Sequence, residues 1–493
     1  MKKSMHPYSP DKLTERLKLD LHINSPIHIG SQESRLLSSE FVFSSGRTHF
    51  IDESRLSLFL KEKELIDLYI KEVGTGAFNM EKFLSRELKT SLKDFISEIS
   101  SMSAPGGSEN MREFKPFIRD GNKDMFLPGS SLKGMFRTAL LYGILEENQE
   151  KKLEIEKTAK EKLNLLPRYK QTFSERWVNE DLLQRFRITK GRIGPDKDIF
   201  RCLKVRDAYP VGNIQTKVIK IKFLSKSNGK GFDWSYRKRG GKSTDQPLEL
   251  WAEVIVNGVF RTELIWDRLL FEKFKKADSD IKIPVNGLDD LISIVFRMNR
   301  RIFSYEADFF SGVQDEAEQP VANAVGNLKN WYEMNAGDYI RLGFGSGMLS
   351  TSVNLHFNEA LRQKIRDLCG HKRENDPAPK SRRICQGDYG QWMSLGWMKM
   401  VPASEDDVGA VHGKPSVHMS AVSNLDKLLE ELSLVKPNDM GRIGTIVQKI
   451  DTLETDKEKG VLAKAVQDKI GLRAFKKHKK MEYMRELIFK AGL

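Results

Sequence analysis

Apolar and polar residues alternate near the start of the chain. Leucine or isoleucine occupies every second position from Leu17 to Ile23, and polar or charged residues stand between them. This two-residue period predicts a half-buried strand that ends at the Asn-Ser-Pro turn after it. Residues 248–256 alternate in the same way before an Asn-Gly turn, and the short apolar runs at 40–43 and 48–51 predict a further hairpin. The pattern therefore favours antiparallel strands.

Apolar residues at intervals of three and four positions predict helices elsewhere in the chain. Asp52 is expected to cap the first of them. The predicted helices cover residues 52–69, 80–99, 132–147, 286–308 and 357–369. Residues 101–109 are rich in serine, proline and glycine, which predicts a loop between the second and third helices.

The distribution of these elements predicts two regions. Residues 1–400 contain the strands, together with a charged helical insertion at about 146–185 and a basic loop region at about 185–246. Residues 401–493 change from a loop-like start to several short helices, and we expect them to form a basic helical extension. No repeat of fixed period is visible, which argues against a solenoid.

A Pro-Gly-Ser-Ser turn precedes one of the predicted helices. Ser130 or Ser131 is expected to cap it, and Lys133 and Arg137 share one face because they lie four residues apart. The free amides at a helix start attract anions, so Gly129 and the two serines, with the two cations behind them, predict a phosphate site. An ordinary capped core helix is the alternative interpretation.

The composition indicates a basic protein of the cytoplasm. The 493 residues are 39% hydrophobic and 30% charged, and they contain no apolar run long enough to span a membrane. Three widely spaced cysteines and no apolar stretch after the initial Met-Lys-Lys favour a reducing compartment without disulfides or a secretory signal.

The positive charge is concentrated in one stretch. The net charge is +14, and residues 185–242 alone contain 17 lysines and arginines against four aspartates, interleaved with aromatic residues. Cations with interspersed aromatic rings are typical of surfaces that bind phosphates and stacked bases. A solvated loop with excess lysine is the alternative.

The candidate nucleotide and metal motifs do not have the residue spacing that such sites require. Residues 240–243 end like a P-loop but lack the glycine required earlier, and the alternating glycines of residues 343–347 lack the dinucleotide spacing. Such glycines instead let a backbone approach a ligand closely. Cys369, His371 and Cys385 lack the paired spacing of a zinc site. We therefore predict no metal and no cofactor.

Histidines are the candidate general bases for RNA cleavage. His28 and His49 lie near the first predicted hairpin. His28 stands between two isoleucines before a glycine, where a structural histidine is favoured. No constellation in the sequence forms a convincing active site, so we predict no catalytic residue.

Several segments together resemble the RAMP superfamily proteins of CRISPR effectors. Ser-Pro-Ile-His-Ile-Gly-Ser at 25–31, the segment 127–137 and the glycine loop at 341–347 are similar to motifs of that superfamily. Phe-Arg-Cys-Leu-Lys-Val-Arg-Asp at 200–207, and Pro-Lys-Ser-Arg-Arg at 379–383 with the Leu-Gly-Trp-Met-Lys that follows, resemble the family of the fifth Csm subunit of type III-A complexes. The resemblance spans about residues 15–400.

This resemblance implies an α+β fold with a ferredoxin-like, RRM-type core, in which helices pack on an antiparallel sheet. It also implies a non-catalytic subunit that caps the Csm filament at the 3′ end of the crRNA and supports crRNA maturation and antiviral interference. The implied partners are the 3′ portion of the crRNA, target RNA and other Csm subunits, especially the repeated backbone subunit and the small subunit.

The RNA-contacting candidates come from the motifs that carry the resemblance and from their basic neighbours. They are His28, Gly129, Ser130, Ser131, Lys133, Arg137, Lys204, Arg206, Gly343, Gly345, Ser346, Gly347, Arg382 and Arg383.

Three alternatives remain open from the sequence. The chain could be a RAMP subunit of another type III system, or a metal-independent repeat-processing endoribonuclease with His28 or His49 as base. It could also be a scaffold whose basic residues at 476–480 bind a protein partner.

Overall fold

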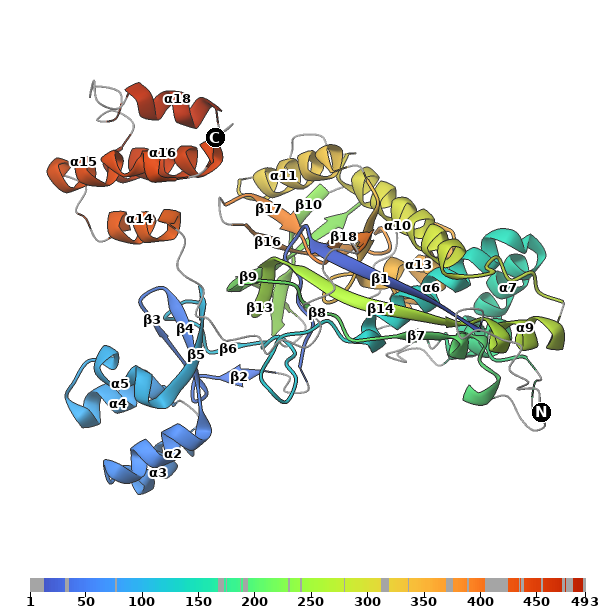
Figure 1. Ribbon diagram of the computed structural model, residues 1–493, viewed down its shortest axis with the longest axis horizontal. Coiled ribbons are helices and arrows are strands. Elements are labelled where there is room, and N and C mark those ends of the chain that lie inside the picture. Colours follow the sequence, from blue (N-terminus) through green and yellow to red (C-terminus); the bar gives the residue numbers. More distant parts are fainter. Residues whose placement is uncertain are drawn as a thin grey trace, which may run out of the picture. The chain divides into compact units, whose positions relative to one another are not determined.

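The computed structural model divides into two compact units, Met1–Asp406 and Asp407–Leu493, which we describe separately. The structure describes residues 13–31, 35–75, 78–166, 173, 175–186, 188, 194–228, 231–239, 242–278, 280–311, 319–335, 337–368, 376–387, 390–403, 424–433, 435, 439–453, 455–471, 475 and 482–490. Figure 1 shows the elements of both units. None of the helices in these ranges is long and apolar enough to cross a bilayer.

The first sheet of the larger unit is entirely antiparallel. Its strands follow the order β15-β18-β1-β14-β7, and β8 also pairs with β14. In chain order they are β1 (Thr14–Ile23), β7 (Leu203–Val205), β8 (Tyr209–Pro210), β14 (Val259–Asp267), β15 (Tyr339–Arg341) and β18 (Trp397–Pro402). The two longest, β1 and β14, run side by side in Figure 1.

Two long helices complete a ferredoxin-like arrangement. Helix α6 (Gly129–Glu147) lies between β1 and β7 in the chain, and α10 (Leu288–Ser311) lies between β14 and β18. The resulting β-α-β-β-α-β order, with β18, β1, β14 and β7 as successive neighbours, is the expected core topology. The predicted α+β fold class is confirmed.

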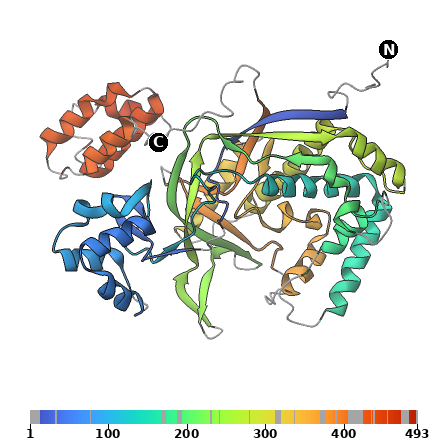
Figure 2. The same cartoon turned by 60° about the horizontal axis from the view of Figure 1, so that its bottom comes forward.

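The alternation in β1 determines which face of this sheet is buried. Leu19 and Leu21 are 2% and 1% exposed, and they belong to the same apolar core as Phe136 of α6 and Val295 of α10. The residues between them point to the opposite face of the sheet. Figure 2 shows β1 (blue) at the margin of the unit, with α6 on one side of it.

We expected a basic loop region at 185–246, but part of this stretch belongs to a second antiparallel sheet. Its order is β10-β9-β16-β17, and β13 pairs with β9. Its strands are β9 (Gln215–Ser227), β10 (Gly231–Trp234), β13 (Glu249–Asn257), β16 (Ser381–Gln386) and β17 (Trp392–Ser394). A separate hairpin joins β11 (Tyr236–Arg239) to β12 (Lys242–Pro247).

The basic loop expectation fails because the lysines of β9 alternate with buried apolar residues. Ile219 and Ile221 are 7% and 0% exposed, while Lys220 and Lys222 lie on the opposite face over tryptophan rings. Each tryptophan ring packs against the aliphatic stem of a lysine and also attracts its ammonium charge. The high charge of this segment therefore does not prevent it from forming a strand.

A smaller lobe of the larger unit contains the predicted hairpin. Strands β3 (Phe41–Ser44), β4 (Arg47–Ile51) and β5 (Ser100–Pro105) form one sheet. Its helices are α2 (Glu53–Glu62), α3 (Ile66–Val73), α4 (Met80–Leu88) and α5 (Leu92–Ile99). Two short strands, β2 (Leu36–Leu37) and β6 (Glu113–Phe114), pair beside this lobe.

In this lobe the predicted helix cap is confirmed, whereas the predicted helix at 80–99 and the predicted loop at 101–109 need correction. Asp52 caps α2 by accepting a hydrogen bond from the amide of Arg55, as predicted. The single helix expected at 80–99 is two helices, because Lys89 adopts φ of 53° and interrupts it. The expected loop at 101–109 begins instead as β5.

The remaining helices of the larger unit include those of the charged insertion. They are α7 (Gln149–Leu165), α8 (Arg176–Leu182), α9 (Arg268–Ala277), α11 (Val321–Met334), α12 (Gly347–Ser350) and α13 (Glu359–Leu368).

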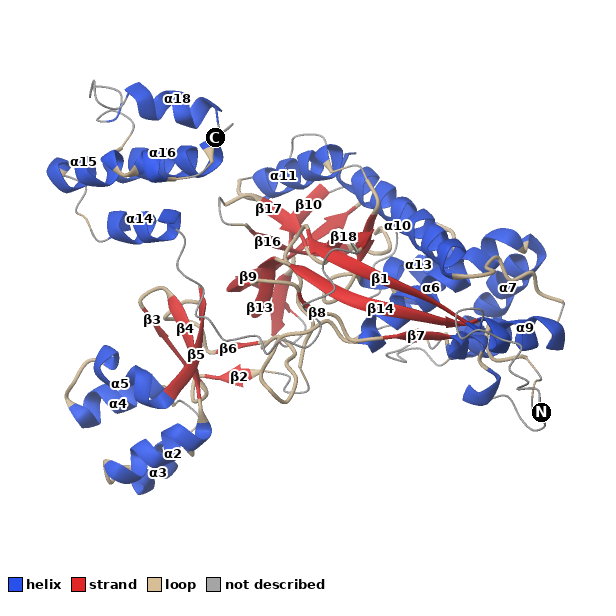
Figure 3. Ribbon diagram, in the orientation of Figure 1, coloured by secondary structure: helices blue, strands red, loops and turns tan. Residues whose placement is uncertain are grey.

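The C-terminal unit has a separate apolar core and, where described, consists of helices (Figure 3). They are α14 (Asn424–Ser433), α15 (Met440–Gln448), α16 (Asp456–Ile470) and α18 (Glu482–Lys490). The basic residues at 476–480 lie outside the described residues.

A buried ion pair fastens the segment before α6 to the second sheet. Glu253 of β13 is fully buried, and its carboxylate accepts hydrogen bonds from both terminal nitrogens of Arg119, at 2.6 and 2.8 Å. It also accepts one from the amide of Phe117 at 2.9 Å. Removing this carboxylate would leave the Arg119 charge largely enclosed without a carboxylate to compensate it.

We therefore expect Glu253→Ala to lower the free energy of unfolding by about 3–5 kcal/mol in chemical denaturation. Glu113→Ala is the control, because the pair between Glu113 and Arg35 is exposed and its loss should cost less than about 1 kcal/mol. Equal effects of the two substitutions would contradict this account of the buried pair.

Candidate nucleic-acid interface

The start of α6 is already occupied by a carboxylate of the same chain. Helix α6 begins at Gly129, and neither Ser130 nor Ser131 caps it through a side chain, which corrects the predicted cap. The Gly129 amide donates a hydrogen bond to Oδ1 of Asp207 at 2.6 Å. A Cβ at this position would lie 2.5 Å from the carbonyl oxygen of Val205, so only glycine fits. The carboxylate of Asp207 thus occupies the position at which we expected a phosphate to bind.

The two cations behind this turn also have internal partners. Lys133 Nζ donates to the carbonyl oxygen of Leu203 at 2.6 Å, and Arg137 forms an ion pair with Asp198 at 2.8 Å. Both cations lie over the ring of Phe200. Burial lowers the pKa of Lys133, and the neighbouring Arg137 lowers it further. In this arrangement the two side chains fasten the segment before β7 to α6.

Lys204 and Arg206 lie on the other side of the first sheet from α6. Both are exposed, Lys204 on β7 and Arg206 just after it. Arg206 Nε forms an ion pair with Glu263 of β14 at 2.8 Å. Lys204 has no such partner among the described residues. The structure therefore separates these two cations from Lys133 and Arg137.

The glycine loop at 343–347 turns sharply between β15 and α12. Gly343, Gly345 and Gly347 have φ values of +82°, +100° and +73°, which favour glycine. A Cβ on Gly343 would lie 2.5 Å from the carbonyl oxygen of His28, whereas one on Gly347 would meet nothing within 4 Å. The loop is therefore packed at its start and open at its end.

Two hydrogen bonds hold this loop in place. The Phe344 amide donates to the carbonyl oxygen of His28 at 2.8 Å, and the Ser346 hydroxyl donates to that of Gly343, also at 2.8 Å. The ring of Phe344 meets the His28 ring edge-on, with 5.9 Å between centroids. The glycine loop and the segment after β1 that contains His28 thus come together from distant parts of the sequence.

His28 has a structural place in this assembly. It is 1% exposed, and its Nδ1 lies 2.7 Å from the carbonyl oxygen of Glu253. Burial lowers its pKa from the ordinary value, which favours the neutral ring. An enclosed neutral ring that is bonded to the backbone does not reach an RNA strand, so we correct the assignment of His28 as an RNA contact.

Arg382 is also buried and paired. Its side chain is 4% exposed, and its Nε donates to Oε2 of Glu306 at 2.6 Å. Its guanidinium carbon lies 3.7 Å from the centroid of the Phe309 ring. The structure therefore corrects Arg382 from an RNA contact to a link between β16 and α10.

Arg383 differs sharply from its neighbour. It is half-buried, and its guanidinium lies between two rings, 5.4 Å from the centroid of Phe223 and 4.7 Å from that of Phe344. Burial lowers the pKa of Arg383, and the charge of Arg341 lowers it further. Across the described residues no carboxylate pairs with Arg383, so its charge remains available to a ligand beside the glycine loop.

The surroundings of Arg383 contain more positive than negative charge. Arg341 is 2% exposed and lies 3.7 Å from the same Glu306 carboxylate that binds Arg382. We call Arg341, Arg382 and Arg383 with Glu306 the arginine cluster. Two of the three guanidiniums share the one carboxylate, and Nη2 of Arg382 and Nε of Arg383 are enclosed without a hydrogen-bond partner in the described part of the chain. A partly buried positive excess of this kind favours an anionic ligand.

Sequence reasoning missed three members of this site. Lys115 lies on the ring of Phe344, with its Nζ 5.8 Å from the centroid, and no described carboxylate pairs with it. Phe344 itself lies within the predicted glycine loop but was not a candidate. Glu306 could have been predicted from the sequence. An acidic residue on the apolar face of a helix, between Phe303 and Phe309, implies a buried partner.

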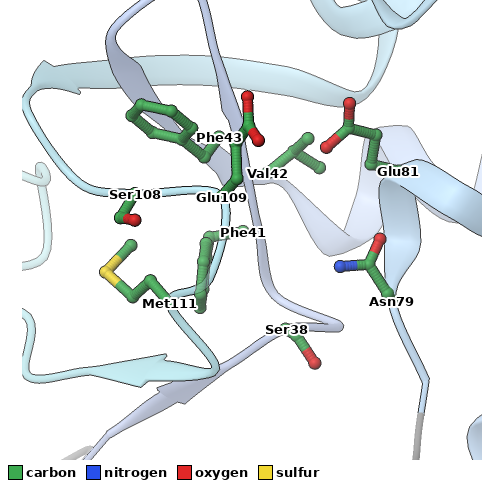
Figure 4. Close-up of a pocket in the computed structure, with 9 residues that line it drawn as sticks. All are labelled: Ser38, Phe41, Val42, Phe43, Asn79, Glu81, Ser108, Glu109 and Met111. Atoms are coloured by element: carbon green, nitrogen blue, oxygen red, sulfur yellow. The ribbon is translucent and has the colours of Figure 1, made fainter.

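Features that would suggest other chemistry are weak in the described ranges. They contain no group of three or more acidic, histidine or cysteine side chains arranged for a metal ion. A small hollow in the smaller lobe is lined by Phe41, Asn79, Glu81, Glu109 and their neighbours (Figure 4). Its roughly 10 Å³ is about the room that one water molecule needs.

The comparisons with known proteins identify the family. Residues 20–346 match the RAMP superfamily, and the chain belongs to it. Within this superfamily the chain resembles the fifth Csm subunit, because its relatives include CRISPR system proteins named Csm5. It is 23% identical over 352 residues to that of Methanocaldococcus jannaschii, covering 68% of this chain and 72% of the relative. It is 27% identical over 254 residues to that of Streptococcus thermophilus, covering 48% and 60%.

Two solved structures are also similar to this chain. One is a chain of a Csm–crRNA–target RNA ternary complex from a type III-A CRISPR-Cas system, with a TM-score of 0.48, 22% identity and coverage of 79% of this chain and 100% of that one. The other is T. onnurineus Csm5, with a TM-score of 0.49, 20% identity and coverage of 77% and 99%.

The internal role of Asp207 gives a direct prediction. Asp207→Ala removes the acceptor for the Gly129 amide, and we expect it to lower the free energy of unfolding by about 1 kcal/mol without weakening RNA binding. Asp207→Asn keeps an acceptor oxygen and should retain most of the stability. Thermal or denaturant unfolding and an RNA titration measure both quantities. Weaker RNA binding by well-folded Asp207→Ala would contradict the structural role.

Proposed function

We propose that this chain is a non-catalytic RNA-binding subunit of a type III-A CRISPR effector, the Csm complex. In this proposal it caps the Csm filament in the cytoplasm, holds the 3′ portion of the crRNA, and supports crRNA maturation and antiviral interference. Its neighbours are the repeated backbone subunit and the small subunit, and target RNA passes nearby. The RAMP membership and the Csm5 relatives support this assignment.

The observation that carries the proposal is the charge left over beside the glycine loop. Arg383 and Lys115 lie on Phe344, and neither forms an ion pair with a described carboxylate. Gly347 leaves the backbone open at the same place. Partly buried cations next to bare backbone suit the phosphates of a single strand, and the phenyl rings keep the cations oriented.

The cleavage alternative finds less support in the same geometry. A general base must reach the proton that it abstracts. His28 is enclosed, and burial lowers its pKa. His49 is half-buried on β4, and its pKa is likewise lowered by burial and then by Arg47. Neither histidine is adjacent to a carboxylate that would orient it in the described hydrogen bonds. We therefore favour binding over cleavage.

The test removes charge while keeping side-chain volume. Arg383→Met combined with Lys115→Met should weaken binding of crRNA about tenfold at a fixed salt concentration. It should also reduce the slope of log K against log salt by about 1.4, because each lost phosphate contact on a single strand contributes about 0.7.

Arg176→Met is the matched control. Arg176 is an exposed arginine, 84% accessible, that pairs with Glu180 on α8. The control should leave both the affinity and the slope unchanged. Unaltered binding by the double variant, at wild-type stability, would reject the glycine loop and Arg383 as the RNA site.

A further inference from the structure

The face of the first sheet that points away from α6 has exposed residues on β1, β7 and β18. The apolar side chains of β1 and β14 point toward α6 and α10, where Leu19, Leu21 and Phe260 are buried in the common core. Residues directly opposite in an antiparallel pair point to the same face. The outward face therefore consists of the alternate residues of each strand. From β1 they are Arg16, Lys18, Asp20 and His22, and from β14 they are Val259, Arg261, Glu263 and Ile265.

The acidic residues on this face are neutralised within it. Both carboxylate oxygens of Asp20 accept hydrogen bonds from the guanidinium of Arg261, at 2.7 and 2.8 Å. Glu263 pairs with both Arg16 and Arg206, at 3.2 and 2.8 Å. Both carboxylates are largely covered, with 13% and 19% side-chain exposure. No bare carboxylate remains among these residues to repel an anion.

Three lysines on the same face are left without a partner. Lys18 of β1 is exposed, as are Lys204 of β7 and Lys399 of β18. Register places Lys399 opposite His22, and Lys204 opposite Ile265, which in turn faces Arg16. Within the described ranges none of the three lysines forms an ion pair. We call Lys18, Lys204 and Lys399, together with Arg16, the basic strip.

We propose that the basic strip binds the phosphate backbone of single-stranded RNA as a second contact, separate from the glycine loop. This inference rests on the proposed function as an RNA-binding subunit. Successive outward residues of a strand are about 6.6 Å apart, which is close to the separation of neighbouring phosphates in an extended single strand. Arg16 and Lys18, two positions apart on β1, therefore match neighbouring phosphates, and Lys204 and Lys399 extend the strip onto β7 and β18.

The chemistry of the strip favours nucleic acid over protein. The centre of a protein interface is usually depleted in lysine, whereas three of the four strip residues are lysines. Tyr209 lies opposite Arg261 and Tyr339 opposite Lys399 on the same face, and such rings stack on bases with little regard to their identity. Binding there should therefore depend on salt and be nearly indifferent to the RNA sequence.

The experiment compares two triple variants of the full chain with equal loss of charge. One carries Lys18→Ala, Lys204→Ala and Lys399→Ala. The control carries Lys82→Ala, Lys273→Ala and Lys276→Ala, which removes three exposed lysines elsewhere. Each is titrated with short oligouridylate and oligoadenylate over a range of salt concentrations, and thermal unfolding verifies that both variants fold.

The strip variant should bind both oligonucleotides about tenfold more weakly and should lose about 2 from the slope of log K against log salt, while the control remains close to wild type. Affinity and slope equal to the control would overturn the proposal. Retained RNA affinity with lost assembly into the Csm complex would overturn it in favour of a protein partner. If Arg383→Met and Lys115→Met weaken binding while the strip variant does not, the strip fails and the proposed function stands.

Discussion

One buried carboxylate, that of Glu306, joins α10 to the strands on either side of the glycine loop. It lies on α10, and it compensates Arg382 of β16 directly and Arg341 of β15 at slightly longer range. A ferredoxin-type helix, the strand that leads into the glycine loop and the second sheet thus meet at a single buried charge. Breaking such a contact leaves two enclosed cations, which is far more costly than the loss of a surface pair.

The same contact explains why Arg383 is available. Glu306 is shared by two arginines, so no carboxylate remains for the third, and the phenyl rings of Phe223 and Phe344 supply only partial compensation. The glycine loop is then held beside this excess charge by its packing against the backbone of His28. One arrangement therefore both stabilises the fold and leaves the half-buried Arg383 without a carboxylate partner among the described residues.

Much of the scaffold was predictable from local patterns. The two-residue period of β1, the hairpin of β3 and β4, and the Asp52 cap all depend on neighbouring residues, and each appears in the structure. The second sheet was not predictable in this way, because the lysines of β9 raise the charge of a strand whose tryptophan partners come from β10, β13 and β17. Local charge counts do not contain that information.

The candidate site was only partly predictable, for the same reason. Three alternating glycines indicate a tight turn wherever they occur, so the loop could be found from the sequence. The difference between Arg382 and Arg383 depends on strand register, which directs one side chain to α10 and the other to Phe344. The carboxylate at the start of α6 comes from Asp207, far along the chain. Only the fold brings these groups together.

Photocrosslinking within the assembled Csm complex can show whether RNA lies against the glycine loop and Arg383. A crRNA carrying a photoreactive uridine at successive positions would be irradiated, and the attached peptides of this chain identified by mass spectrometry. We expect nucleotides in the 3′ portion to attach to peptides containing residues 343–347 or Arg383. Efficient crosslinks from those nucleotides to other surfaces, with none at these two, would contradict this expectation.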